Sequence, residues 1–209
     1  MERYLIGYGS LINPDERERI GLARDVAIVR VHGYARKWNV QASNKKTYLG
    51  VVPDPSSSLN AVLVPVTETQ LHQLDERERA YDRVEVRSGQ WTVDGGLRTV
   101  TNSSLFADRG SLVKMWIYVP KAEWRSEVAT PACAVKRRYV DTVIAGYLYY
   151  GDGFATEFVA TTSLWEQYWF ENRTVPQQLR EQIDALVGQY YPRATQVLTR
   201  LPSSRRPVG

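Results

Sequence analysis

The hydrophobic pattern of this chain changes once, near Pro120, and the change limits the folds that the chain can adopt. Before Pro120, short apolar or alternating runs recur between turn signals, which is typical of β-strands. These predicted strands lie at residues 4–8, 26–31, 38–40, 48–52, 61–66, 82–87, 91–93, 97–100 and 113–119. After Pro120, helical spacing predicts helices at residues 132–150, 154–159 and 176–189. This order predicts an α+β fold with a small closed or strongly curved sheet and helices packed against it.

Polar segments divide the predicted strands from one another. Residues 53–58 contain two prolines and three serines, so they predict a turn between two strands. Residues 94–96 read Asp-Gly-Gly, which is a hairpin signal, and residues 101–110 predict a polar loop. One further helix is expected between strands, at residues 69–81.

Length and composition are those of an ordinary globular protein. The 209 residues suffice for one domain with an appendage, and 43% of them are hydrophobic and 24% charged. No apolar run approaches the roughly 20 residues that span a bilayer, and no signal-peptide pattern precedes residue 4. Cys133 is the only cysteine, which excludes an internal disulfide and favours the cytoplasm. His32 and His72 are the only histidines, so the chain has few candidate ligands for a zinc site.

The positive charge of the chain is modest and partly terminal. The net charge is +4 and the pI about 9.2, and Arg205 and Arg206 lie in a short Ser/Arg/Pro tail. Such a tail is typical of flexible, solvated chain. The sequence has no Lys/Arg stripe interleaved with aromatic residues, so we expect neither nucleic acid nor a membrane as a partner.

Glu78 occupies a position where a charged residue is unexpected. In the predicted helix at residues 69–81, the one apolar stripe consists of Leu71, Leu74, Glu78 and Tyr81. A lone carboxylate on an inward face is costly unless it is paired or takes part in chemistry. Desolvation in a cleft would raise its pKa and make it a better proton shuttle, whereas neighbouring arginines would lower the pKa.

The first predicted strand ends in a tight turn with the sequence Tyr8-Gly9-Ser10-Leu11. Successive backbone N–H groups in such a turn can bind a carboxylate or stabilise an oxyanion, and glycine allows close approach of a ligand. An ordinary turn is the alternative. The turn is no dinucleotide fingerprint, because Ile12 stands where the third glycine would be. It is no nucleophile elbow either, because Ser10 lacks the following glycine and a histidine partner.

Three further side chains carry reactive or hydrogen-bonding groups. Tyr81 and Tyr139 could each present a hydroxyl in a pocket, although tyrosines are often purely structural. Cys133 is better interpreted as a small buried thiol than as a nucleophile, because no base lies near it in the sequence.

Five segments of the sequence occur in an order that resembles the γ-glutamylcyclotransferase family. They are Tyr8-Gly9-Ser10-Leu11, Gly33-Tyr34-Ala35-Arg36-Lys37-Trp38-Asn39, Leu74-Asp75-Glu76-Arg77-Glu78, Tyr81-Asp82-Arg83-Val84-Glu85-Val86 and Arg138-Tyr139-Val140-Asp141-Thr142-Val143-Ile144-Ala145-Gly146. The resemblance covers roughly residues 1–150. It implies a small mixed β-barrel with flanking helices that needs no metal and no cofactor.

The resemblance also implies roles for individual residues. Glu78 would be the catalytic acid and base, and the substrate would be bound by Tyr8, Gly9, Ser10, Leu11, Tyr81 and Tyr139. The chain departs from the family pattern near Ala61, where a glycine is usual, and again after residue 150. There, an aromatic stretch with Trp165, Tyr168, Trp169 and Phe170 would cap the pocket, form a subunit contact or fill the core.

The expected organisation is a barrel domain at residues 1–150, a helical extension packed on it at 151–201 and a flexible tail at 202–209. The expected reaction cyclises a γ-glutamyl group to 5-oxoproline and releases an amine. The main alternatives are another γ-glutamyl transfer or hydrolysis, and a non-catalytic binding module. The last would be favoured by Glu78 buried against an arginine with no open cleft beside Gly9. The sequence leaves open the leaving amine and the oligomeric state.

Overall fold

The computed structural model describes residues 2–42, 46–87, 89–93, 113–126, 129–165, 168–190 and 196–198. The predicted hairpin turn at 94–96, the strand at 97–100, the loop at 101–110 and the tail at 202–209 lie outside the described residues. Among the described segments, no helix is long and apolar enough to cross a membrane.

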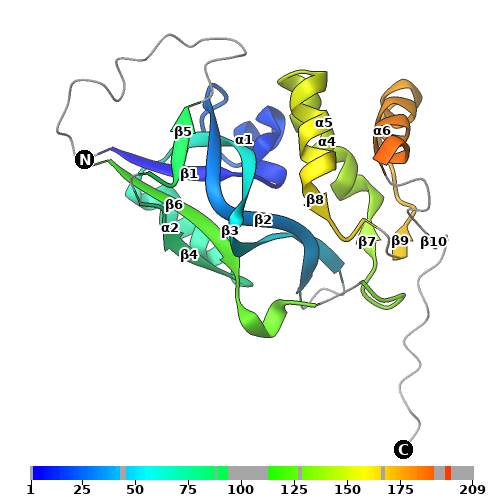
Figure 1. The fold of residues 1–209 in the computed structure, drawn as a ribbon, viewed down its shortest axis with the longest axis horizontal. Helices are drawn as coiled ribbons and strands as arrows, with labels where there is room; N and C mark the ends of the chain where they lie inside the picture. Colours follow the sequence, from blue (N-terminus) through cyan, green and yellow to red (C-terminus); the bar gives the residue numbers. More distant parts are fainter. Residues whose placement is uncertain are drawn as a thin grey trace, which may run out of the picture.

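One mixed sheet runs through the molecule, and long strands bend it strongly (Figure 1). Its strands are β1 (Arg3–Gly7), β2 (Ala27–Ala42), β3 (Lys46–Pro65), β4 (Tyr81–Glu85), β5 (Trp91–Val93), β6 (Lys114–Pro120), β7 (Val135–Lys136), β8 (Thr162–Ser163), β9 (Tyr168–Phe170) and β10 (Gln196–Leu198). The order is β10-β9-β7-β3-β1-β6-β4, and β2 pairs with β3, β5 and β8. These pairings do not close a ring among the described strands, so the sheet is curved but open. The predicted α+β class is confirmed.

The helices are α1 (Pro14–Arg19), α2 (Glu68–Arg77), α4 (Arg137–Tyr149), α5 (Asp152–Thr161) and α6 (Gln177–Tyr190), with short 3-10 turns η1 (Ser10–Ile12) and η2 (Ala122–Trp124). In Figure 1, α4, α5 and α6 lie together beside one end of the sheet, whereas α2 lies near β4 and β6. Thr67 and Gln70 form a capping box that starts α2. Asn13 caps α1 ahead of Pro14, since its side chain accepts a hydrogen bond from the Asp15 N–H at 2.9 Å.

The predicted turn at residues 53–58 is wrong as a strand boundary, because β3 continues through it. The pairing of β3 with β2 passes from Pro53 opposite Tyr34 to Ser58 opposite His32, so the intervening residues form a bulge. Asp54 stabilises this bulge by accepting hydrogen bonds from the Ser56 N–H at 3.0 Å and the Ser56 hydroxyl at 2.7 Å. The polar residues therefore turn locally while the strand on either side keeps its partner.

Two predicted helices have different bounds in the structure. The helix expected at 69–81 ends at Arg77, and Glu78 is its C-cap residue with φ −95° and ψ 41°. Tyr81 already belongs to β4, so the expected stripe of four helical residues is wrong. The helix expected at 132–150 begins only at Arg137, because Val135 pairs with strands β3 and β9. In both cases, pairing with a distant strand overrides local helical spacing.

The described residues after 150 pack tightly on the rest of the chain. Trp165 is fully buried against Trp38, with ring centroids 5.3 Å apart, and Trp169 is 3% exposed, so both fill the core. Arg173 donates three hydrogen bonds of 2.7–3.0 Å to the buried carboxylate of Asp141 on α4. Three short strands of this segment join the sheet beside its two helices. The domain boundary at residue 150 itself stays a prediction.

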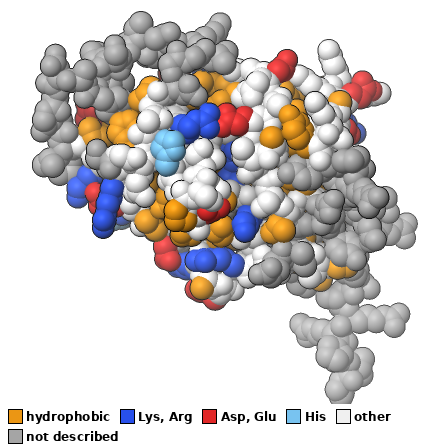
Figure 2. Space-filling view, in the orientation of Figure 1, with side chains coloured by type: hydrophobic (Ala, Val, Ile, Leu, Met, Phe, Trp, Pro, Cys, Tyr) orange, Lys and Arg blue, Asp and Glu red, His pale blue; other side chains and the backbone are white. Residues whose placement is uncertain are grey.

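Charged side chains of both signs lie next to one another on the face drawn in Figure 2. Ion pairs between exposed side chains include Arg24 with Asp15 at 2.8 Å. Exposed pairs of this kind contribute little to stability, about 0–1 kcal/mol each. They leave the burial of apolar side chains as the main source of stability.

Candidate functional site

A single pocket brings together all seven residues that the sequence analysis singled out as site residues. It encloses about 380 Å³, part of which is open to solvent, and is lined by Ile6, Gly7, Tyr8, Gly9, Ser10, Leu11, Leu49, Glu78, Tyr81, Tyr118 and Tyr139. These residues come from the end of β1, from β3, from the segment after α2, from β6 and from α4. Their location is an observation, whereas their roles stay predictions.

The turn after β1 is held by its own carbonyl groups. The Ile12 N–H donates to the Gly9 carbonyl at 3.0 Å, and the Asn13 N–H donates to the Ser10 carbonyl at 3.1 Å. In a trans peptide the N–H points opposite to the carbonyl of the same plane, so the Ser10 and Leu11 N–H groups point away from these bonds. Amide groups at the start of a helical turn have no acceptor within the turn. The turn therefore offers N–H groups to the pocket, and its Ser10 backbone lies near enough to Tyr139 to oppose slightly the rise that burial causes in the pKa of that hydroxyl.

Helix α4 contacts this turn directly because Gly146 has no side chain. A Cβ at that position would lie 2.5 Å from Ile12 Cγ2 and 2.6 Å from the Asn13 backbone nitrogen. The Asn13 side chain also donates to the Thr142 carbonyl of α4 at 3.0 Å. This close contact places Tyr139 at the turn, where a Cβ on Gly9 would lie 3.2 Å from the Tyr139 hydroxyl.

Glu78 faces the pocket, and its side chain is 22% exposed. Burial raises the pKa of its carboxyl above the ordinary value, and the charge of Arg77 opposes the rise. The Arg77 Nε lies 3.3 Å from Glu78 Oε1, and its Nη2 donates to the Ser10 hydroxyl at 3.3 Å. Residues one apart do not face each other within a helix, and Arg77 can approach Glu78 because Glu78 lies beyond the last helical residue. The sequence alone did not give the direction in which the Glu78 pKa shifts, and in the structure the shift is upward.

The tyrosine hydroxyls of the pocket are held in place and stay protonated. Tyr81 donates to the Leu49 carbonyl at 3.0 Å. The Tyr139 ring packs edge-on against Trp38 and Tyr48, with centroids 5.9 and 5.1 Å away. Burial raises the pKa of both hydroxyls far above 10, and the neighbouring Glu78 charge raises them further. Each hydroxyl is therefore a neutral hydrogen-bonding group at any physiological pH.

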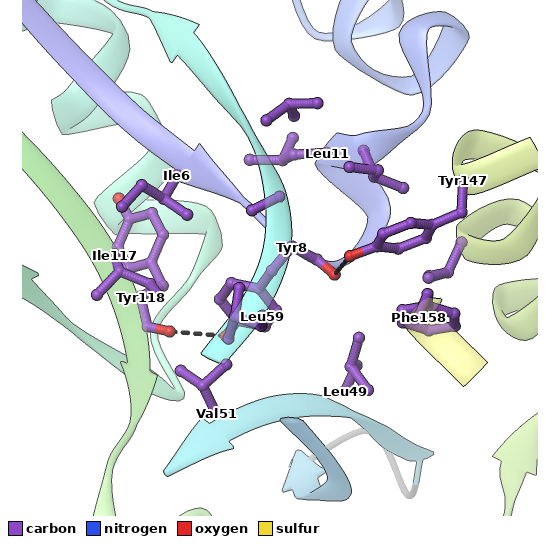
Figure 3. Close-up of a cluster of buried hydrophobic side chains, with 14 of the residues drawn as sticks. Ile6, Tyr8, Leu11, Leu49, Val51, Leu59, Ile117, Tyr118, Tyr147 and Phe158 are labelled. Carbon is purple, nitrogen blue, oxygen red and sulfur yellow. Dashed lines mark hydrogen bonds between the residues drawn. The ribbon is translucent and has the colours of Figure 1, made fainter. Parts of the chain in front are cut away.

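Tyr118 also lines the pocket, and the sequence analysis treated it only as a strand residue. Its hydroxyl donates to Asp75 Oδ1 at 2.8 Å, and its carbonyl accepts a 2.6 Å hydrogen bond from the Tyr8 hydroxyl (Figure 3). Asp75 of α2 thus holds the Tyr118 side chain in the wall of the pocket. The alternation of Trp116 and Tyr118 with aliphatic residues on β6 is the signal that could have identified this wall.

Neither the cysteine nor the histidines form part of the pocket lining. Cys133 is half-buried, and burial raises the pKa of its thiol. Within the segments that the structure describes, no group of three or more His, Cys, Asp or Glu side chains could hold a metal ion.

Comparison with known proteins identifies the family. Residues 5–134 match the family described as "Gamma-glutamyl cyclotransferase, AIG2-like". A solved structure named "Gamma-glutamyl cyclotransferase" superimposes with a TM-score of 0.56 at 11% identity, over 88% of this chain and 99% of that one. The structure of an uncharacterized human protein superimposes with a TM-score of 0.54 at 12% identity, over 88% and 98% of the two chains.

At these identities the two structures show a common fold and nothing finer. A search of curated protein sequences finds no match. The family match spans more than half of the chain and includes the turn, Glu78 and Tyr81, whereas Tyr139 lies beyond it. The chain therefore belongs to the gamma-glutamyl cyclotransferase, AIG2-like family.

Proposed function

We propose that this protein cyclises the γ-glutamyl group of a γ-glutamyl amine or peptide to 5-oxoproline and releases the amine. The observation that carries the proposal is one pocket that contains both Glu78, with its raised pKa, and the amide groups of the Gly9-Ser10-Leu11 turn. Glu78 supplies a proton acceptor, and the amide groups of the turn supply hydrogen-bond donors for an anionic group. Family membership supports the same reaction class.

The turn and the tyrosines hold the glutamyl half of the substrate. Backbone N–H groups at residues 9–11 bind the glutamyl end, where they can pair with carboxylate oxygens. Tyr81 and Tyr139 orient the chain through hydroxyls that remain protonated. Holding the chain folded converts a flexible molecule into one whose amine lies near its own carbonyl, and such proximity lowers the barrier substantially.

Glu78 moves the protons of the reaction. It accepts one proton from the α-ammonium group, and the freed amine attacks the γ-carbonyl carbon to form the ring C–N bond. When the original amide C–N bond breaks, Glu78 returns its proton to the departing nitrogen. The extra proton on the ring nitrogen leaves with the amine product, so the products are 5-oxoproline and an ammonium ion. A carboxyl whose pKa is shifted towards neutrality is well suited to both steps.

The reaction is tested by product analysis. Wild-type protein is incubated with glutathione, γ-L-glutamyl-L-alanine and γ-L-glutamyl-butylamine, and 5-oxoproline and glutamate are measured by mass spectrometry. Glu78→Gln should retain the fold and lose at least about 100-fold in kcat, in line with general acid–base catalysis. Glu76→Gln is the matched control, because Glu76 is exposed on α2, two residues before Glu78, and does not line the pocket. Normal turnover by Glu78→Gln would refute the assignment.

Two alternatives make different predictions in the same experiment. Free glutamate in place of 5-oxoproline would indicate hydrolysis on the same fold. The absence of any product would indicate a binding module. The contact of Arg77 with Glu78 agrees with that last alternative, but the open pocket beside Gly9 does not.

The proposal extends to organisation and location. Residues 1–150 would form the catalytic domain, with residues 151–201 packed on it and a flexible tail after them. The reaction scheme uses no metal or cofactor, and the single cysteine agrees with a location in the reducing cytoplasm.

A further inference from the structure

Behind the pocket, on the side of helices α4 and α5, lies a fully buried arginine, Arg36 of β2. Its guanidinium donates to the Asn60 carbonyl at 2.8 Å, the Asn60 side-chain oxygen at 2.8 Å, the Thr161 hydroxyl at 2.7 Å and the Tyr147 hydroxyl at 2.5 Å. All four acceptors are neutral. The rings of Tyr147 and Phe158 lie 5.3 and 4.8 Å from its central carbon.

Burying the Arg36 guanidinium in this way costs free energy that a purely structural role does not require. A buried charge without a hydrogen-bonded carboxylate is costly, and packed apolar side chains would stabilise the core at least as well. The nearest acid to contribute, Glu157, is engaged by Arg30 through two hydrogen bonds of 2.5 and 3.0 Å. The position of Arg36 therefore calls for an explanation in terms of what it holds.

Arg36 holds the hydroxyl of Tyr147 in one orientation. A guanidinium can only donate, so the Tyr147 oxygen must accept from it and must donate its own proton elsewhere. Two carbonyls lie within reach of that proton: that of Tyr8 at 3.0 Å (Figure 3), and that of Asn60 at 3.2 Å, which already accepts from Arg36. Burial raises the pKa of Tyr147 to about 12, so the hydroxyl keeps its proton at neutral pH.

The Tyr8 carbonyl belongs to the first peptide of the turn. No described peptide bond is cis, so the Gly9 N–H points opposite to this carbonyl. Because the carbonyl points to the Tyr147 hydroxyl, the Gly9 N–H points away from that hydroxyl, and Gly9 itself forms part of the pocket lining. The Tyr147 hydroxyl thus fixes the plane of the peptide that supplies this N–H.

We propose that Tyr147, oriented by Arg36, is a positioning residue that directs the Gly9 N–H at the carboxylate of a bound γ-glutamyl substrate. This inference rests on the proposed function. It predicts that Tyr147→Phe, which removes one oxygen and keeps the ring, weakens substrate binding. Without its partner the Tyr8–Gly9 peptide can rotate, and the N–H loses its fixed direction.

A matched control exists on the same helix end. Tyr150 also accepts a hydrogen bond from a buried arginine, Arg17, at 2.9 Å, and it is the arginine that donates to the turn, at the Leu11 and Ile12 carbonyls and not at Tyr8 or Gly9. Tyr150→Phe therefore removes an equivalent oxygen without touching Gly9. Both variants should fold and show a modest, comparable fall in Tm, because each loses a hydrogen bond to a buried arginine.

The experiment measures kcat and KM with one of the three γ-glutamyl compounds named above, glutathione, γ-L-glutamyl-L-alanine or γ-L-glutamyl-butylamine. The compound used is the one that wild type turns over fastest. Tyr147→Phe should raise KM about tenfold and change kcat less than threefold, because the N–H binds ground state and transition state alike. Tyr150→Phe should leave both constants within twofold of wild type. In the inactive Glu78→Gln background, calorimetry with the same compound should show binding about tenfold weaker when Tyr147→Phe is added.

Each other outcome overturns the inference. Unchanged KM in a folded Tyr147→Phe variant, or equal changes in Tyr147→Phe and Tyr150→Phe, would show that the hydroxyl only supports the fold. Failure of Tyr147→Phe to fold would show the same. If wild type makes no 5-oxoproline from any panel compound, the proposed function fails first, which distinguishes the two failures.

Discussion

Gly146→Ala tests whether the close contact between α4 and the turn holds the site together. The new Cβ would lie 2.5 Å from Ile12 Cγ2, 2.6 Å from the Asn13 nitrogen and 2.7 Å from the Asn13 Cα. Two of these three atoms belong to the backbone, so a side-chain rotation cannot relieve the overlap and α4 must move away from the turn.

The expected cost follows from two opposing effects. Overpacking costs about 1–3 kcal/mol, and contacts with backbone place this site near the upper limit. Replacing glycine by alanine inside a helix returns about 1 kcal/mol of helix propensity. The net loss should therefore be about 2 kcal/mol, which corresponds to a fall in Tm of about 4–8 °C for a chain of this size.

Gly188→Ala is the control, because Gly188 also lies in a helix but has no atom within 4 Å of the position that a Cβ would occupy. It should gain about 0.5–1 kcal/mol from helix propensity alone. Denaturant unfolding followed by tryptophan fluorescence measures both variants. If Gly146→Ala proved as stable as wild type while Gly188→Ala gained stability, the proposed steric contact with the turn would be wrong.

Three further predictions concern charge. Because burial raises the folded-state pKa of Glu78, its ionisation lowers the stability of wild type as pH rises through that pKa. Glu78→Gln should therefore have a higher Tm than wild type at pH 7, and the difference in Tm should disappear below about pH 4. A difference in Tm that does not change with pH would contradict this. Arg77→Gln removes the charge that lowers the Glu78 pKa, so the acidic limb of the pH profile of kcat/KM should move to higher pH. A shift to lower pH would show that Arg77 does not pair with Glu78. Arg17 is fully buried and donates to the Leu11 and Ile12 carbonyls at 2.7 and 2.9 Å. Arg17→Met should therefore lower the free energy of unfolding, measured with denaturant, by at least about 3 kcal/mol. A decrease below about 1 kcal/mol would mean that water replaces these hydrogen bonds.

The sequence predicted the fold class and the residues of the pocket better than it predicted their geometry. Helical spacing singled out Glu78 and Tyr81 together, yet α2 ends before both of them. They meet because the turn after the helix leads directly into β4, where Tyr81 reaches the Leu49 carbonyl. A pattern that marks inward-facing residues remains informative even when the element that carries them ends early.

Other parts of the site gave no local signal. Arg36, Tyr147 and Asp75 have hydrogen-bond partners that lie far away in the sequence; Arg36 and Tyr147, for example, are 111 positions apart. Nothing in the neighbourhood of Asp75 distinguishes it from a solvated acid, because its partner Tyr118 lies on another strand. The start of α4 was missed for a similar reason, since only the pairing of β7 with distant strands shows that Val135 is extended.

The central position of β1 has a consequence for how the protein acquires its site during synthesis. Its partners are β3 on one side and β6 on the other, and the hydrogen bond between Tyr8 and Tyr118 joins residues 110 positions apart. Loop closure over such distances is slow, and a nascent chain must wait for the later strand before the earlier one is fully paired. Helix α2 can form long before that moment, but the cavity cannot. Appearance of ligand binding would therefore report completion of the whole sheet, whereas helical content would report only its local beginnings.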